Sequence, residues 1–320
     1  MRYIAQAPGK VILVGEHFVV HGGYAIAASI AEGVRAEARK LPGNQIRIIS
    51  EDLGVTAEIP NQIPRELSPL VQCVSTIIDR CKYSGGLELR LKSMIPPSAG
   101  LGSSAATAVS GVAATSFALG RRLNSVEIVE LAMISERAVH GNPSGIDVYA
   151  STYGGIMLFR KGPKVVRKFI KPGKPLQLIV AYDKGGRQTS KLISRVDDFR
   201  RSGQSLFSAL LTANDVMVKK VTNLIKLGRI ADVGAYLNFY QAILSNMNLS
   251  SPDIDSLVES SLTGGALGAK LTGAGGQGSL IALSPDNKFK KIGKRLSKIS
   301  ERVIEVTLPT PGVRVWMEKT

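Results

Sequence analysis

The 320-residue sequence predicts a mixed α/β protein built from two domains. Its length is typical of one large or two ordinary domains, and an apolar content of 44% is enough for a sizeable core. Strand-like apolar runs alternate with helical patterns along the chain, which favours an α/β (α+β) class. Small residues and a predicted hairpin lie between Gly154 and Gly162. We therefore expect domains over residues 1–158 and 159–320, with a late strand still free to return to the first.

The first hundred residues are strand-rich. Short apolar runs predict one or two strands over 3–17 and further strands over 24–30, 34–41, 46–50 and 87–94. Apolar residues at helical spacing predict a helix over 68–81. Cys73 and Cys81 would then be separated by about 12 Å of helix rise, which is too far for a disulfide. We expect both cysteines to be reduced.

The rest of the chain continues this alternation. Asn124 or Ser125 can cap a helix that ends near Gly141, with Glu136 at the edge of its buried face. The stretch 153–170 is typical of a hairpin. The later elements comprise a strand over 176–182, helices near 188–200, 205–227, 229–246 and 252–262, strands within 268–276, 278–284, 302–308 and 312–318, and a basic helix within 288–298.

Charge and composition narrow the classes of function. The net charge is +16, but Lys and Arg are spread along the chain, and the aromatic content of 5% does not favour base stacking. We therefore do not expect nucleic-acid binding as the main function. The sequence has no long uncharged apolar run and no signal-peptide pattern at its start, so we expect a cytoplasmic protein without membrane association. Three histidines without ligand spacing do not favour zinc.

The stretch 95–107, "IPPSAGLGSSAAT", is typical of an anion-binding loop. Gly100 and Gly102 allow backbone conformations that bring a ligand close to the main chain. Ser103 and Ser104 can cap a following small-residue helix that runs to about Arg121, and a helix start favours anions. The stretch is not a P-loop, because no lysine follows Gly102. A plain Gly/Ser turn that caps a buried helix explains it equally well.

Three other segments carry candidate functional residues. Lys10 follows a Pro-Gly turn at the start of a strand, and Glu16 and His17 follow that strand. Asp147 lies in the second turn of a short helix that Pro143 can start. The stretch 270–283 contains "GAGG" between two strands. Taken singly, these features fit a surface lysine, a buried histidine, a helix-surface carboxylate and a glycine bulge.

Taken together and in order, "APGKVILVGEH", "PPSAGLGSSAA" and "KLTGAGGQGS" resemble the three motifs of the GHMP kinases over nearly the whole chain. The resemblance implies a ribosomal-protein-S5-like first domain, a ferredoxin-like second domain and a site between them. Within the family, "GEHFVVHGG" and "HGNPSGID" are similar to the branch that phosphorylates mevalonate. The expected substrates are therefore ATP and mevalonate, and a homodimer remains open.

The resemblance also implies site residues. Asp147 corresponds to the catalytic base, and Lys10 to its partner, which stabilises charge near the attacking oxygen. Ser104 and Glu136 correspond to ligands of Mg²⁺, whose charge, with the helix start, would neutralise the triphosphate. The ATP-binding positions are Pro97, Ser98, Ala99, Gly100, Leu101, Gly102, Ser103, Ser104 and Ala105. The substrate-side positions are Glu16, His17, Thr189, Gly273, Ala274 and Gly275.

Two rival functions remain. One is a GHMP kinase for another small alcohol or for phosphomevalonate. The other is a basic RNA-binding protein on an S5-like fold, which salt-sensitive RNA binding without ATP turnover would favour.

Overall fold

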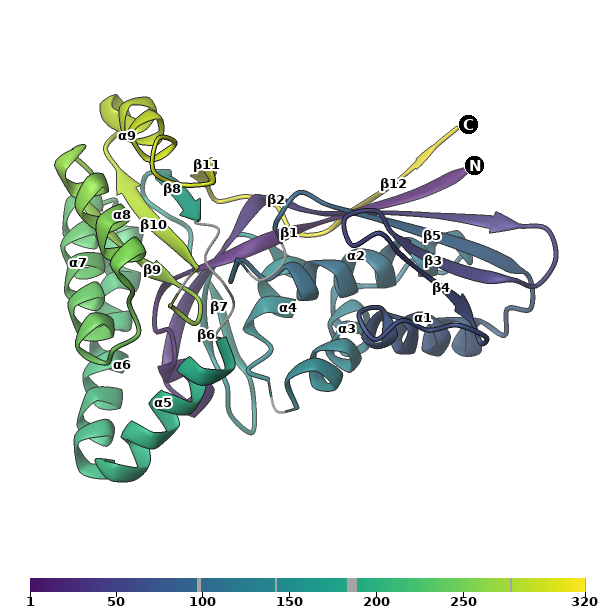
Figure 1. Ribbon diagram of the computed structural model, residues 1–320, viewed down its shortest axis with the longest axis horizontal. Coiled ribbons are helices and arrows are strands. Elements are labelled where there is room, and N and C mark those ends of the chain that lie inside the picture. The colour runs from purple at the N-terminus through teal and green to yellow at the C-terminus, as the bar shows by residue number, and fades with distance from the viewer. Residues whose placement is uncertain (97–98, 142, 183–188, 277, 320) are drawn as a thin grey trace.

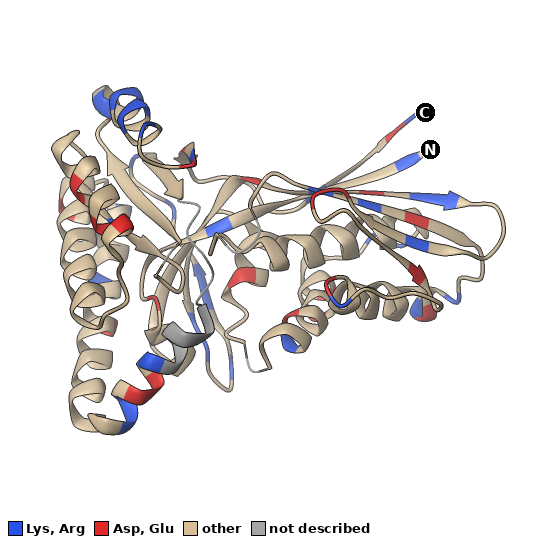
Figure 2. Cartoon of the chain, viewed as in Figure 1, with Lys and Arg blue, Asp and Glu red and all other residues tan. Residues whose placement is uncertain are grey.

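The computed structural model describes residues 1–96, 99–141, 143–182, 189–276 and 278–319, and the side chains of 189–194 are also outside this part. The molecule is elongated, with a larger sheet at one end, a smaller sheet at the other, and the two termini side by side (Figure 1). Lys and Arg are distributed over both ends, and helix α9 (Phe289–Leu296) is visibly basic (Figure 2).

The larger sheet contains eight strands, and their order is β12-β1-β2-β5-β3-β4, with β6 paired to β2 and β7 paired to β6. Its strands are β1 (Arg2–Val14), β2 (Tyr24–Leu41), β3 (Ile46–Ser50), β4 (Val55–Ile59), β5 (Gly86–Ser93), β6 (Ile156–Arg160), β7 (Val166–Phe169) and β12 (Arg314–Glu318). The predicted hairpin is confirmed as β6–β7. The last strand, β12, returns to pair with β1.

Four helices accompany this sheet: α1 (Ser68–Cys81), α2 (Ser103–Ala118), α3 (Ser125–His140) and α4 (Ile146–Tyr153). The small-residue helix α2 packs against β1 and β2 and is flanked by α1 and α3 (Figure 1). Asn124 caps α3, as predicted, in a capping box with Glu127. Both cysteines are free thiols, which confirms the absence of a disulfide between them.

The smaller sheet is antiparallel, with the order β11-β8-β10-β9. Its strands are β8 (Leu176–Tyr182), β9 (Gly268–Thr272), β10 (Ser279–Ser284) and β11 (Arg302–Leu308). The helices of this half are α5 (Thr189–Ser202), α6 (Gln204–Lys226), α7 (Ile230–Asn246), α8 (Pro252–Thr263) and α9, with short 3₁₀ turns η1 (Phe18–His21) and η2 (Asp286–Lys288). Helices α7 and α8 pack against β9, and α9 packs against β8 and β11.

Two predicted breaks lie inside continuous strands. The prediction of a Pro-Gly turn before Lys10 is wrong, because β1 runs through Pro8 and Gly9 with only a register shift. A Cβ at Gly9 would lie 2.3 Å from Ile95 Cδ1 and 2.9 Å from the Leu101 carbonyl oxygen. The glycine therefore serves close backbone packing within a bulge. Likewise, the two strands predicted over 24–30 and 34–41 form the single strand β2.

Two helix starts also differ from the sequence prediction. Neither Ser103 nor Ser104 caps α2: the N-cap is Gly102, at φ 75°, without a side-chain cap. Helix α4 begins at Ile146, so Asp147 lies in its first turn and not in its second. In both cases a left-handed glycine immediately precedes the helix and offers no capping side chain of its own; in α4 the Ile146 amide donates to Ser144 Oγ at 3.4 Å.

The two halves share a continuous interior. One core cluster contains residues of β1 and β2 together with residues of β8, β9 and β10. Thr272 Oγ1 accepts a hydrogen bond from the Ile12 amide at 2.8 Å and donates to the Ile12 carbonyl at 3.1 Å. The mixed α/β, two-part fold class is confirmed, while the division at residue 158 stays a prediction. In the described part of the chain, no helix is long and apolar enough to cross a membrane.

Candidate active site

Lys10 and Asp147 form an ion pair at the centre of the molecule. Lys10 Nζ lies 3.4 Å from Asp147 Oδ1 and donates a hydrogen bond to the Gly100 carbonyl at 2.9 Å. The Lys10 side chain is 5% exposed and that of Asp147 is 30% exposed. Strand β1 supplies the lysine, and the first turn of α4 supplies the aspartate. The Asp147 carboxylate is therefore accessible to a ligand, while the Lys10 ammonium is buried next to it.

The glycine-rich loop wraps around this pair. Gly100 and Gly102 both adopt φ 75°, the left-handed region that favours glycine. A Cβ at Gly102 would lie 3.0 Å from Lys10 Cγ and 3.8 Å from Asp147 Cβ. The Leu101 carbonyl accepts a hydrogen bond from the Lys10 amide at 2.8 Å. The loop therefore brings the start of α2 directly against the ion pair, where its amides and dipole suit an anion.

Ser104 and Glu136 meet beside the same helix start. Ser104 Oγ donates a hydrogen bond to Glu136 Oε1 at 3.1 Å, and Glu136 is only 4% exposed. Burial, followed by the nearby Asp147 carboxylate, raises the pKa of Glu136 to about 7. A buried carboxylate next to a second carboxylate is costly without a cation. This pair of oxygen donors is therefore chemically suited to a divalent metal ion.

Glu16 forms a fully buried ion pair with Lys270 of β9, and neither side chain is exposed to solvent. Burial raises the pKa of Glu16 and lowers the pKa of Lys270, and in each case the partner's charge opposes the shift. Among the described residues, Glu16 Oε2 has no hydrogen-bond partner. In this structure Glu16 thus joins the end of β1 to β9.

His17 makes the next link between the halves. Its Nε2 lies 3.0 Å from the Ala274 carbonyl oxygen, so this nitrogen carries the proton and donates. The residue is 8% exposed, and burial lowers the pKa of His17 to about 4. A neutral imidazole with one nitrogen engaged is suited to positioning the turn after β9.

The remaining predicted positions divide into three groups. Gly273 meets the loop, since a Cβ there would lie 3.0 Å from the Gly100 carbonyl oxygen. Gly275 instead packs against Leu249, whose carbonyl oxygen a Cβ would approach to 2.2 Å. Thr189 is the first residue of α5, but its side chain lies outside the described part, as do Pro97 and Ser98.

Comparisons with known proteins show the family of this chain. The family models described as "GHMP kinases N terminal domain" and "GHMP kinases C terminal" match residues 69–155 and 220–300. A mevalonate kinase of Aeropyrum pernix is 32% identical, with 97% of each chain covered. The chain belongs to the GHMP kinases.

Other relatives of this GHMP kinase cover most of its length as well. A mevalonate kinase of Pyrococcus furiosus is 33% identical over 91% of this chain and 92% of its own. The crystal structure of L. major mevalonate kinase in complex with R-mevalonate is 30% identical, with a TM-score of 0.80 and 96% of each chain covered.

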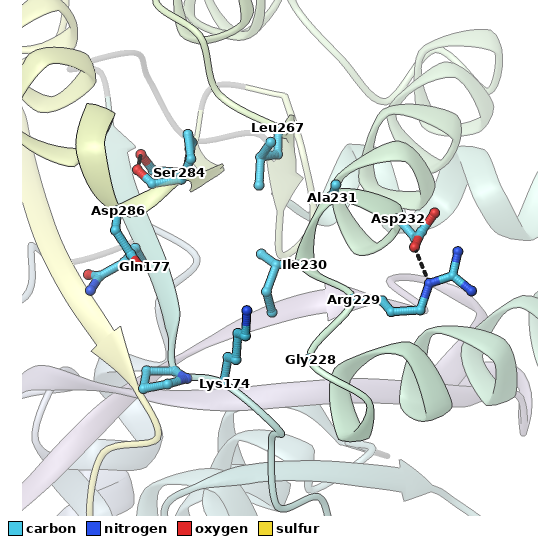
Figure 3. A pocket seen from close by; sticks show the side chains of 12 residues that line it. Lys174, Gln177, Gly228, Arg229, Ile230, Ala231, Asp232, Leu267, Ser284 and Asp286 are labelled. Carbon is cyan, nitrogen blue, oxygen red and sulfur yellow. Dashed lines mark hydrogen bonds and ion pairs between the residues drawn. The ribbon is translucent and has the colours of Figure 1, made fainter.

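Two cavities of this GHMP kinase differ in whether predicted site residues line them. One, of about 240 Å³, opens beside Ser103 and Ser104 and has a largely apolar lining that includes Val34, Leu53 and Leu67. The other, of about 590 Å³, lies between the start of α7 and the far end of β10, and Lys174, Ile230 and Ser284 line it (Figure 3). Among the predicted site residues whose side chains the structure describes, none lines this larger cavity.

Sequence reasoning about this GHMP kinase missed three buried residues that connect the smaller sheet to the site. Lys270 pairs with Glu16, Thr272 binds the backbone of Ile12, and Ser279 Oγ donates to the Ala99 carbonyl at 2.6 Å. All three are at most 1% exposed. They lie in or beside the quoted glycine motif, which was the only signal for them, because their partners are distant in sequence.

Proposed function

We propose that this GHMP kinase is an ATP-dependent mevalonate kinase that transfers the γ-phosphoryl group to the C5 hydroxyl of mevalonate and yields 5-phosphomevalonate for isoprenoid biosynthesis. The single observation that carries this proposal is the Lys10–Asp147 pair, held against the loop that starts α2. Mevalonate kinases at 32% and 33% identity over most of the chain support this acceptor. A cytoplasmic location belongs to the same proposal.

Asp147 is the proposed base. Its partly exposed carboxylate can accept the proton of the acceptor hydroxyl as the new P–O bond forms. Lys10, 3.4 Å away, stabilises the negative charge that develops near the attacking oxygen. Gly100, Gly102 and Ser103 would present amides and a hydroxyl to the phosphates. Positioning and electrostatics supply most of the acceleration in phosphoryl transfer.

Ser104 and Glu136 would hold Mg²⁺. The fit rests on a buried carboxylate whose described hydrogen-bond partner is a serine hydroxyl, a donor set of hard oxygens. Among the described residues, no group of three or more His, Cys, Asp and Glu could hold a metal ion. Two protein donors are consistent with Mg²⁺, which also takes phosphate oxygens and water. When bound, the metal supplies neutralisation of phosphate charge.

The 240 Å³ cavity beside Ser103 is the proposed location of the nucleoside part of ATP. Its apolar lining suits a planar base, and its position at the start of α2 places the phosphates over the helix amides. His17 and Ala274 remain the proposed acceptor-side positions, and the buried Glu16 would support them through its pair with Lys270. The acceptor and ATP would therefore meet above Asp147.

The test is a panel of acceptors incubated with Mg-ATP, with ADP release as the readout. Mevalonate should give the highest turnover, well above phosphomevalonate, homoserine and galactose. Equal or greater turnover with another alcohol would assign a different GHMP kinase activity. If none of the four acceptors caused ADP release and the protein bound RNA in a salt-sensitive way, the RNA-binding alternative would be supported.

A further inference from the structure

Ser279, the first residue of β10, reaches across to the phosphate-binding loop. Its Oγ donates a hydrogen bond to the Ala99 carbonyl at 2.6 Å, and the residue is 1% exposed. Ala99 belongs to the larger-sheet half, whereas Ser279 pairs with Thr272 and Tyr182 in the smaller sheet. The contact therefore attaches the loop to the second half of the molecule.

This hydrogen bond fixes one peptide plane of the loop. The carbonyl of Ala99 and the amide of Gly100 belong to the same peptide, and in a trans peptide they point in opposite directions. Holding the carbonyl toward Ser279 therefore sets the direction of the Gly100 amide. A glycine at φ 75° has no side chain to restrict it, so the loop depends on such external contacts for its order.

The same peptide leads directly to the catalytic pair. The next carbonyl along the chain, that of Gly100, accepts the hydrogen bond from Lys10 Nζ at 2.9 Å, and Lys10 Nζ lies 3.4 Å from Asp147 Oδ1. Gly273, in the turn after β9, also lies against Gly100, because a Cβ at Gly273 would lie 3.0 Å from the Gly100 carbonyl oxygen. A shift of Ala99 would thus displace the acceptor that orients Lys10.

We propose that Ser279 is a positioning residue of this kinase: through Ala99 and Gly100 it holds the phosphate-binding loop and the Lys10 ammonium in register with Asp147. This role needs no contact between Ser279, which is 1% exposed, and either substrate. The proposal rests on the proposed phosphoryl transfer and adds to it a residue from the second half of the molecule. Small displacements of reacting groups cost enzymes large factors in rate, so one interior hydrogen bond can matter here.

Ser279→Ala tests the proposal, with Ser284→Ala as a matched control. Ser284 ends the same strand, is 2% exposed and donates from Oγ to the Pro285 carbonyl at 2.8 Å, but it lines the distant cavity (Figure 3). Both variants remove one buried hydroxyl, so both should lower the thermal midpoint by similar amounts. Ser279→Ala should also lower kcat about tenfold, with a change of less than about threefold in KM for mevalonate. Ser284→Ala should keep the kcat of the wild type.

A second variant, Ser279→Cys, distinguishes a loss of positioning from a folding defect in Ser279→Ala. Ser279→Cys keeps the side-chain size but offers a weaker donor, so its kcat should fall in the same direction. Equal kcat values for Ser279→Ala, Ser279→Cys and Ser284→Ala would overturn the positioning role. That result is distinct from a failure of the proposed function, which would appear as absent mevalonate turnover in the wild-type protein.

Discussion

Lys10 and Asp147 lie close together because two single glycines adopt left-handed backbone conformations. Gly102, left-handed at φ 75°, lets the start of α2 lie against the lysine stem, and Gly145, at φ 79°, directs the chain into α4 so that Asp147 occupies its first turn. A side chain at Gly102 would meet both members of the pair. The catalytic geometry thus depends on glycines as well as on the charged residues.

Asp147→Asn should nearly abolish turnover while ATP-analogue affinity and the thermal midpoint stay close to those of the wild type. Asparagine keeps the size of the side chain but cannot accept the proton, and a general base contributes about 10²–10⁴-fold. Lys10→Met should also slow the reaction, and the double variant should lose less than the two separate losses combined, because the residues act as a unit. Single-turnover rates measure this, with the exposed Asp286→Asn as control. More than about a tenth of the wild-type rate in Asp147→Asn would refute the role of base.

Ser104→Ala and Glu136→Gln should raise the Mg²⁺ concentration needed for half-maximal activity. Ser104→Ala removes a hydroxyl oxygen, and Glu136→Gln replaces a charged carboxylate with a neutral amide, which is a weaker ligand for Mg²⁺; the two oxygens lie 3.1 Å apart. Magnesium titrations of kcat provide the measurement. Glu130→Gln is the control for Glu136, because Glu130 lies on the exposed side of the same helix, paired with Arg80. Unchanged titrations for both site variants would mean that Ser104 and Glu136 are structural.

A short series of side-chain contacts connects the region of β1 with the region of β9. The Glu16–Lys270 pair, the Thr272 contacts with Ile12, and the His17 hydrogen bond to Ala274 all connect the first strand and η1 with β9 and the turn after it. Each contact joins β1 or the turn after it to β9 or the turn after it. The glycine turn that approaches the loop is therefore held in place from the larger sheet as well as from its own.

Lys270→Met should destabilise the protein by about 3–5 kcal/mol, because it leaves the Glu16 carboxylate buried without its partner. The double variant Glu16→Leu/Lys270→Met should recover most of that loss, since apolar residues can replace a buried pair at little cost. Lys290→Met removes the exposed pair with Glu305 and should cost at most about 1 kcal/mol. Denaturant unfolding compares the three. A double variant as unstable as Lys270→Met would contradict this account.

The two sheets form one interior, and this makes the stability of the whole chain sensitive to acid at His17. Burial lowers the pKa of His17 from 6.5 to about 4, so between these values the unfolded chain binds more protons than the folded one. The contribution of neutral His17 to the free energy of unfolding is fully present above about pH 6.5 and is lost progressively toward pH 4. The difference of about 2.5 units corresponds to roughly 3 kcal/mol.

His17→Gln should therefore reduce the loss of unfolding free energy between pH 7 and pH 4 by up to about 3 kcal/mol relative to the wild type. Glutamine retains a donor for the Ala274 carbonyl but does not titrate. His140→Gln, which replaces an exposed histidine, is the control for the substitution itself. Identical profiles for wild type and His17→Gln would show that His17 does not bind protons differently in the two states.

Much of the element order follows from local patterns. The periodicity of α1, the Asn124 capping box and the β6–β7 hairpin depend on residues close together in sequence, and these predictions are confirmed. The failures occur where packing overrides local preference. Pro8 and Gly9 form a bulge inside β1 because the backbone near Leu101 approaches too closely for a side chain. The start of α2 has a glycine N-cap although two serines follow it.

The order and content of the three motifs were sufficient to indicate a GHMP kinase. The resemblance to that family, and not the motifs alone, pointed to Asp147 and Glu136, which lie outside the motifs, as the partners of Lys10 and Ser104. The motifs did not reveal that Glu16 is paired with Lys270, that His17 binds the Ala274 carbonyl, or that Ser279 holds Ala99. Nor did they reveal that β12 closes the sheet beside β1. These contacts join segments from opposite parts of the chain, and their partners and burial are set only when the two sheets pack into one core.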